Sequence, residues 1–82
     1  MDKIEIHYPC EWEFRIIGTD EGSLTQAVSG ILADKKYDLV FSNISKGGKY
    51  ISLALTTVVE SEEERNGIYT ALRKHVRIKS VL

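Results

Sequence analysis

Two kinds of apolar spacing alternate along the chain, and their order limits the fold more than any other feature of the sequence. Residues 12–17, 37–45 and 50–59 alternate between apolar and polar side chains, which is typical of strands with one buried face. Residues 24–32 place apolar side chains three or four positions apart, which is the spacing of a helix. The chain is therefore expected to combine strands with helices.

The second predicted helix has the clearest start signal. Ser61 can accept a hydrogen bond from the backbone N–H of Glu64, whose carboxylate can reach back to the N–H of Ser61. Carboxylates at 62–64 suit the positive end of the helix dipole, and the cations at 73–75 suit its negative end. The apolar stripe of this helix consists of Ile68, Tyr69 and Leu72.

The first helix is expected to follow a turn at residues 18–23, where Asp20 or Ser23 can cap it. Asp34-Lys35-Lys36 is expected to close it, because cations are favoured at a helix C-terminus. Pro9 biases the residues before it toward extended backbone, so residues 1–11 are predicted to be an extended lead-in. The stripe of the first helix consists of Leu24, Ala27, Val28, Ile31 and Leu32.

Two further segments complete the order of elements. Residues 46–49 carry paired glycines, which favour a hairpin turn between two strands. Residues 76–82 alternate again and are predicted to be the final strand. Right-handed crossovers applied to this order predict an α+β, ferredoxin-like βαββαβ sandwich, a four-stranded antiparallel sheet with two helices on one face. We expect residues 1–82 to form one such domain.

The strand pattern divides the side chains between two sheet faces. Those expected to face the helices are Phe14, Leu39, Phe41, Ile51, Leu53, Leu55 and Ile78. The opposite face is expected to carry Glu13, Arg15, Ile17, Tyr50, Ser52, Ala54, Thr56, Arg77 and Lys79. Its mixed charges suit solvent, whereas Ile17, Ala54 and Val58 also suit an interface with a partner or with a second copy of the chain.

Composition and charge narrow the class of partner. Apolar residues make up 43% of the chain, too many for a disordered segment. A formal net charge of −1 disfavours nucleic acid as a partner, because binding to phosphate backbones depends on a basic excess. The single cysteine excludes an internal disulfide, and no signal peptide or membrane-spanning run is evident. We therefore expect a cytoplasmic protein without membrane association.

The sequence offers few groups for catalysis or metal binding. His7 lies in the lead-in and His75 at the end of the second helix, far from Cys10. A reactive thiolate needs nearby positive charge, which the acidic neighbours of Cys10 do not supply, so a packing role is favoured. No ligand spacing typical of zinc is present. We expect a protein that is not an enzyme and that uses no metal or cofactor.

Several short motifs together resemble the bacterial YbeD-like family, also called domain of unknown function 493 or UPF0250. They are Tyr8-Pro9-Cys10, Phe14-Arg15-Ile16-Ile17-Gly18, Ser45-Lys46-Gly47, Tyr50-x-Ser52, Tyr69-x-x-Leu72 and the terminal Val76…Val81-Leu82. The hairpin at 46–50 is one residue longer than the usual form of that family. The resemblance implies a domain similar to ACT-type regulatory domains. Some members carry the label of lipoate regulatory protein, and the family has no established catalytic residues.

Two loops are candidates for ligand binding. In ACT-like domains the first strand–helix loop often takes a small ligand, which here implicates Gly18, Thr19 and Asp20. The alternative for these residues is a simple turn. The hairpin residues Lys46, Gly47 and Lys49 could hold an anion with backbone amides and ammonium groups, but a plain hairpin is favoured because a strand, not a helix, follows.

RNA binding is a third alternative, because RNA-recognition motifs share this order of elements. It would use Arg15, Lys46, Lys49 and Tyr50. The third strand lacks aromatic side chains at Gly48 and Leu53, where the RNA-recognition signature requires them for base stacking. The favoured function is therefore a regulatory or adaptor module that binds a protein partner or a small metabolite. An ACT-like small-ligand sensor is the main alternative.

Overall fold

The computed structural model describes residues 6–45 and 47–82, which form four strands and two helices. The elements are β1 (Cys10–Gly18), α1 (Glu21–Leu32), β2 (Tyr37–Ile44), β3 (Ile51–Val59), α2 (Glu62–Lys74) and β4 (Ser80–Val81). Their order confirms the predicted βαββαβ arrangement. Within the described residues, no helix is long and apolar enough to cross a lipid bilayer.

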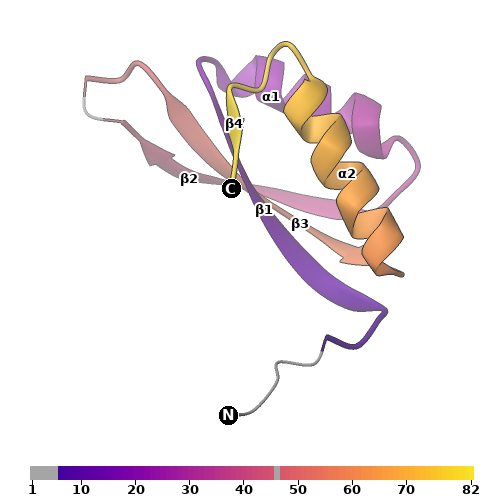
Figure 1. The fold of residues 1–82 in the computed structure, drawn as a ribbon. Coiled ribbons are helices and arrows are strands. Elements are labelled where there is room, and N and C mark those ends of the chain that lie inside the picture. The colour runs from indigo at the N-terminus through magenta and orange to yellow at the C-terminus, as the bar shows by residue number, and fades with distance from the viewer. Residues whose placement is uncertain (1–5, 46) are drawn as a thin grey trace.

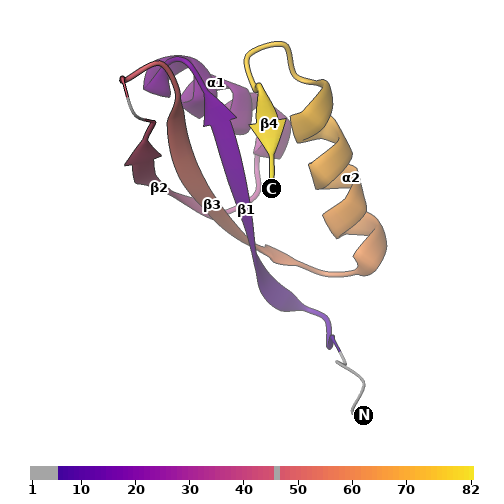
Figure 2. The same cartoon turned by 60° about the vertical axis from the view of Figure 1, so that its left-hand side comes forward.

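The strands form one antiparallel sheet in the order β2-β3-β1-β4. β1 and β3 pair along their whole length, from Cys10 opposite Val59 to Gly18 opposite Ile51. β4 is much shorter and pairs only with the last part of β1 (Figure 1). Both helices lie on the same face of the sheet, and Figure 2 shows the other face uncovered. The structure is therefore the predicted ferredoxin-like α+β sandwich.

The core lies between the sheet and the helices. Alternation along β1 buries Phe14 and Ile16, and alternation along β3 buries Leu53 and Leu55. Burying a side chain of this size contributes roughly 1.5–3 kcal/mol to stability, so these positions dominate the fold. The helix side chains that meet them are Leu24, Ala27, Val28, Leu32, Ile68 and Leu72.

Two strand boundaries differ from the sequence prediction. β1 begins at Cys10, inside the predicted lead-in, because Cys10 and Glu11 still pair with β3. The predicted final strand over 76–82 is wrong for most of its length, since β4 contains only Ser80 and Val81. The chain turns first, with the Ile78 N–H donating to the His75 carbonyl at 3.1 Å, and reaches the edge of β1 only after this turn.

Local details of α1 and β2 also differ from expectation. Asp20, not Ser23, caps α1, and the last turn of α1 carries no basic residue because the helix ends at Leu32, before the predicted closing cations. Phe41 was expected in the core but is 49% exposed. It lies on the edge strand β2, where the pairing with β3 shifts register between Phe41 and Asn43.

Candidate functional site

The first strand–helix loop and the C-terminal loop meet at one end of the sheet because position 18 is a glycine. A Cβ atom on Gly18 would lie 2.6 Å from Leu24 Cδ2 and 3.1 Å from the backbone oxygen of Arg77. Any side chain at this position would push α1 or the C-terminal loop away. Gly18 therefore has a packing role, and it is what brings Arg77 to the start of α1.

A polar hollow of about 300 Å³, here called the α1 hollow, opens at this junction. It is lined by Thr19, Ser23, Val76, Arg77 and Lys79. The sequence predicted Thr19 as a candidate, but it placed Arg77 and Lys79 on the open sheet face. They reach the hollow instead because residues 76–79 form a loop and not a strand.

Asp20 adds a negative charge beside this hollow. Its carboxylate accepts a hydrogen bond from the backbone N–H of Ser23 at 2.8 Å. This bond, the Ser23 hydroxyl and the positive charge of Arg77 hold the pKa of Asp20 below its usual range. The carboxylate is therefore ionised at neutral pH, so an anionic group lies beside the two cations that line the hollow.

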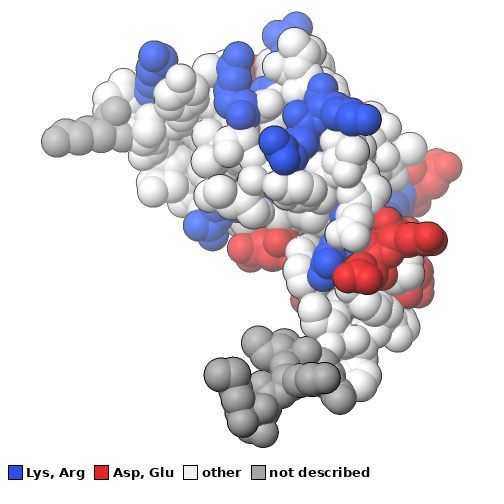
Figure 3. Space-filling view, in the orientation of Figure 1, with Lys and Arg blue, Asp and Glu red and all other residues white. Residues whose placement is uncertain are grey.

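Cations extend from the α1 hollow across the end of α2. Lys79 also lines a second polar hollow of about 340 Å³, together with Tyr69, Arg73, Ser80 and Val81. Figure 3 shows Lys and Arg gathered where α2 ends and the C-terminal loop begins, and Asp and Glu gathered where α2 begins. On this face, α2 thus has an acidic start and a basic end, despite the small net charge of the chain.

The described hairpin residues form the turn through their backbone conformation and hydrogen bonds. Gly47 and Gly48 have φ angles of +91° and +73°, which only glycine adopts readily. The Gly48 N–H donates to the Ser45 carbonyl at 2.8 Å, and the Tyr50 N–H donates to Ser45 Oγ at 2.9 Å. Lys49 Nζ lies 5.5 Å from the centroid of the Tyr50 ring. Lys46 lies outside the described residues.

The predicted site residues thus separate into three places. Gly18 pairs with Ile51, so the first loop and the hairpin lie at the same end of the sheet, yet no described hairpin residue lines the α1 hollow. Arg15 lies farther along the strand on the open face, with its guanidinium 3.6 Å from the Glu13 carboxylate. Among the predicted candidates that the structure describes, Thr19 of the first loop lines a hollow together with the additional charged groups Arg77 and Lys79.

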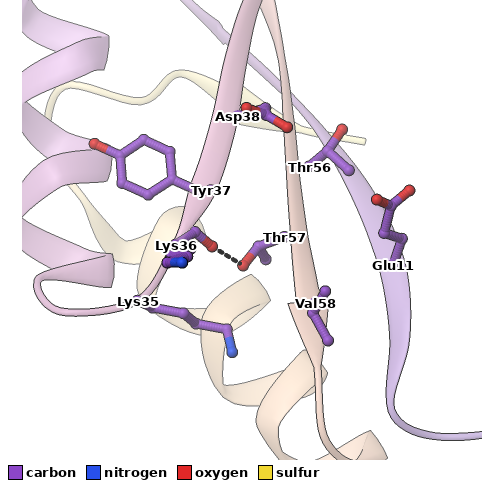
Figure 4. A pocket seen from close by; sticks show the side chains of 8 residues that line it. All are labelled: Glu11, Lys35, Lys36, Tyr37, Asp38, Thr56, Thr57 and Val58. Atoms are coloured by element: carbon purple, nitrogen blue, oxygen red, sulfur yellow. Dashed lines mark hydrogen bonds between the residues drawn. The ribbon is translucent and has the colours of Figure 1, made fainter.

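A larger hollow, about 500 Å³, lies at the opposite end of the sheet and was not predicted (Figure 4). Its lining residues are Glu11, Lys35, Lys36, Tyr37, Asp38, Thr56, Thr57 and Val58. Thr57 Oγ1 donates to the Lys36 carbonyl at 2.8 Å, and Lys35 Nζ lies 3.4 Å from the Glu64 carboxylate. Two of its polar groups are therefore occupied by contacts that hold the loop before β2 against β3 and α2.

The cysteine and the second histidine lie apart. Cys10 is partly buried and packs against the core, while His75 Nδ1 accepts a hydrogen bond from the Arg77 N–H at 3.1 Å. Over residues 6–45 and 47–82, no cluster of three or more His, Cys, Asp or Glu side chains is placed to hold a metal ion. The charged groups of the α1 hollow are therefore the best candidates for ligand binding.

The fold defines a ferredoxin-like domain, and comparison with known proteins identifies its family. Residues 3–82 match the family described as "Protein of unknown function (DUF493)", and the chain belongs to this family. An uncharacterized protein of Helicobacter pylori is 30% identical over 80 residues, covering 98% of this chain and 93% of that protein. A UPF0250 protein of Nitrosomonas europaea is 28% identical over 81 residues, covering 94% and 93%.

A solved structure supports the same assignment. The solution structure of protein HP0495 from Helicobacter pylori superposes with a TM-score of 0.82 at 29% identity, over 98% of this chain and 88% of that one. The family resemblance noted in the sequence is therefore confirmed. The names of these relatives describe no function.

Proposed function

We propose that this chain is a non-catalytic regulatory module whose ligand is a small metabolite bearing a carboxylate, bound in the α1 hollow. One observation carries the proposal: Arg77 and Lys79 line a hollow whose other polar residues, Thr19 and Ser23, come from the first strand–helix loop and the start of α1. Two cations with adjacent hydroxyl groups can hold a carboxylate by charge-assisted hydrogen bonds.

The ionised carboxylate of Asp20 narrows the ligand class. Placed near Arg77, it can accept a hydrogen bond from an ammonium group of the ligand, while the two cations hold the carboxylate. A zwitterion such as an amino acid satisfies both charges, whereas a simple anion meets repulsion from Asp20. Amino acids are therefore expected to bind more tightly than acids of similar size that lack the ammonium group.

Thermal unfolding measures this directly, because a ligand that binds only the native state must stabilise it. The protein is screened against single amino acids, short carboxylic acids and lipoate-related acids. A ligand present at one hundred times its Kd adds about 2.7 kcal/mol. For a domain of this size that corresponds to a rise in Tm of roughly 10–20 °C.

A matched pair of variants locates the binding site. The first double variant, Arg77→Gln with Lys79→Gln, removes the cations of the α1 hollow. The second, Lys35→Gln with Lys36→Gln, removes the same charge at the hollow of about 500 Å³ at the opposite end of the sheet. The first double variant should lose the ligand-induced rise in Tm, and the second double variant should retain it. No rise with any of the compounds at 10 mM, or an equal loss in both pairs, contradicts the proposal.

A second candidate function is an adaptor that binds a protein partner, or a second copy of itself, through the open sheet face. The exposure of Val40 (60%) and Val58 (44%) on this face favours it; Ala54 lies directly opposite Val40, and Val58 lies four residues farther along β3. Light scattering across a hundredfold concentration range tests self-association. A strict monomer throughout removes the homodimer, and Val40→Lys should then leave the elution volume unchanged.

RNA binding is the least supported alternative. Arg15 lies four strand positions from the hairpin, on the order of 13 Å away, and contacts Glu13, which lowers the positive potential around it. Titration of labelled single-stranded RNA at low salt, followed by added salt, tests this alternative. We expect no saturable signal, and a salt-sensitive one would revive it.

A further inference from the structure

The edge of β1 that faces away from β3 is here called the outer edge. β4 covers only the last part of this outer edge. Arg15 donates to Leu82 at 3.2 Å and accepts from it at 2.8 Å, and the Ile17 carbonyl accepts from Lys79 at 2.7 Å. Before Arg15, β1 continues back to Cys10 with β3 on its inner side. Among the described residues, none pairs with this stretch from the outer side.

The backbone of this stretch is arranged to accept another strand. N–H and C=O groups in an antiparallel strand point alternately to its two neighbours. The backbone groups of Arg15 and the carbonyl of Ile17 point toward the outer edge, where they bond to Leu82 and Lys79. By the same alternation, the N–H and C=O groups of Glu11 and Glu13 also point toward the outer edge. Two N–H and two C=O groups therefore form a regular row, which is a template for strand addition.

A mainly apolar groove of about 290 Å³ runs beside this row on the helix side. It is lined by Trp12, Phe14, Arg65, Asn66, Tyr69 and Leu82. The Arg65 guanidinium covers the Trp12 ring at 4.4 Å from its centroid, and Leu82 is 73% exposed. A strand added opposite Trp12 would send every second side chain into this groove, because side chains alternate between the two faces.

The intervening side chains of an added strand would meet negative charge. Glu11 and Glu13 are exposed on the open face beside the same row. Arg15 lies 3.6 Å from Glu13, and within the described residues no cation is paired with Glu11. Opposite charges on directly facing strand positions stabilise the pairing, so lysine or arginine is favoured at the positions facing these two residues.

The same charges disfavour a second copy of β1 as the occupant. Two copies paired antiparallel about Trp12 would set Glu11 of each against Glu13 of the other. This creates two like-charge pairs, and like charges directly opposite destabilise a strand pair. Shifting the register toward Arg15 would require the incoming strand to displace Leu82 from its two hydrogen bonds.

We propose that the outer edge of β1 at Glu11–Glu13 binds an extended peptide segment of a partner protein, in which lysine or arginine alternates with apolar residues. The peptide adds a strand to the sheet, its apolar side chains fill the groove between β1 and α2, and its cations face Glu11 and Glu13. This surface is separate from the α1 hollow, so either proposal can fail without the other.

Amide hydrogen exchange with a defined probe tests the added strand. The probe is a blocked seven-residue peptide of alternating valine and lysine, added at saturating concentration to the full chain. The amides of Glu11 and Glu13 should exchange at least about tenfold more slowly with peptide, while that of Trp12, which faces β3, should change little. Unchanged exchange at Glu11 and Glu13, or protection confined to β2, overturns the proposal.

Charge reversal tests the partner chemistry. Glu11→Lys with Glu13→Lys should weaken the valine–lysine peptide about tenfold and create binding of a valine–glutamate peptide. Glu21→Lys with Asp34→Lys makes the same change in net charge on exposed positions elsewhere and should leave both affinities nearly unchanged. Equal binding of both peptides by the unmodified protein, or equal effects of the two variant pairs, refutes recognition by Glu11 and Glu13.

Discussion

The two halves of β1 pack on the same core but have different neighbours at their edges. From Arg15 to Gly18 the strand lies between β3 and the C-terminal segment, and both of its edges are hydrogen bonded. From Cys10 to Phe14 it has β3 on one side only among the described residues. The burial of Phe14 (2%) and Ile16 (0%) is nearly the same. Cys10 and Trp12 are only partly buried, so the halves differ most in available backbone groups and less in packing.

The C-terminal loop explains this difference. Residues 76–79 make a turn after α2, and the described residues therefore reach the edge of β1 only from Lys79 to Leu82. The same turn carries Arg77 and Lys79 to the α1 hollow. One feature of the chain thus forms the candidate ligand site at one end of the sheet, and toward the other end no described residue pairs with the edge of β1.

The largest expected effect comes from proline placed in each half of β1. Arg15→Pro removes an N–H that donates to Leu82 and should cost at least about 3 kcal/mol of unfolding free energy. Glu13→Pro removes an N–H that faces the open edge and should cost only about 1 kcal/mol. Chemical denaturation measures both, with Arg15→Ala and Glu13→Ala as controls for the lost side chains. Equal costs would mean that both halves are paired.

Gly18→Ala tests how tightly the C-terminal loop packs against the half of β1 from Arg15 to Gly18. The new Cβ would meet Leu24 at 2.6 Å and should destabilise the fold by about 1–3 kcal/mol. Gly30→Ala is the matched control, because nothing lies within 4 Å of a Cβ there and the helix should gain about 0.5–1 kcal/mol. We expect Gly18→Ala to lower the Tm and Gly30→Ala to raise it in thermal denaturation. An unchanged Tm in Gly18→Ala would contradict the close approach.

Arg65→Gln tests the groove beside the half of β1 from Cys10 to Phe14, here called its lower half. It removes the cation over Trp12 and should cost about 0.5–1 kcal/mol. Because Trp12 is the only tryptophan of the chain, its fluorescence should shift in wavelength or intensity as well. Arg73→Gln, which removes a similar contact with Tyr69, should leave the tryptophan spectrum unchanged. An unchanged spectrum in Arg65→Gln would mean that the guanidinium does not cover the ring.

The smallest expected effect is a pH dependence from the two helix caps. Backbone hydrogen bonds from Ser23 and Glu60 hold the pKa values of Asp20 and Glu64 below their usual range. The stability that these groups contribute is present above their unfolded-state pKa values of about 4 and is lost as pH falls through the folded values. Asp20→Asn with Glu64→Gln should therefore lose less stability than the unmodified protein between pH 6 and pH 3. An identical loss would contradict the assignment of the caps.

The sequence predicted the elements well where local signals were strong. One of the two predicted capping-box bonds at Ser61 is formed, with the Glu64 N–H donating to Ser61 Oγ at 3.1 Å. The Glu64 carboxylate accepts a hydrogen bond from the N–H of Glu60 and not from that of Ser61. The alternation of β3 correctly assigned Leu53 and Leu55 to the core. These signals depend on neighbours in sequence, so a single chain is enough to reveal them.

The remaining features depend on contacts between distant segments. The alternation of Val76 to Lys79 indicates a strand, but the turn after His75 moves these residues away from β1. Their placement at the α1 hollow depends on the close approach at Gly18, which no local pattern shows. Phe41 has the spacing of a core residue but lies at the sheet edge beyond the helices, so its exposure also escaped prediction.

Hydrogen exchange of the free protein tests the central claim most directly. If β4 leaves the lower half of β1 unpaired, the amides of Glu11 and Glu13 exchange at nearly the rate of an open chain, while those of Trp12, Phe14 and Arg15 are strongly protected. Protection of Glu11 and Glu13 equal to that of Arg15 would show that another segment already occupies this edge.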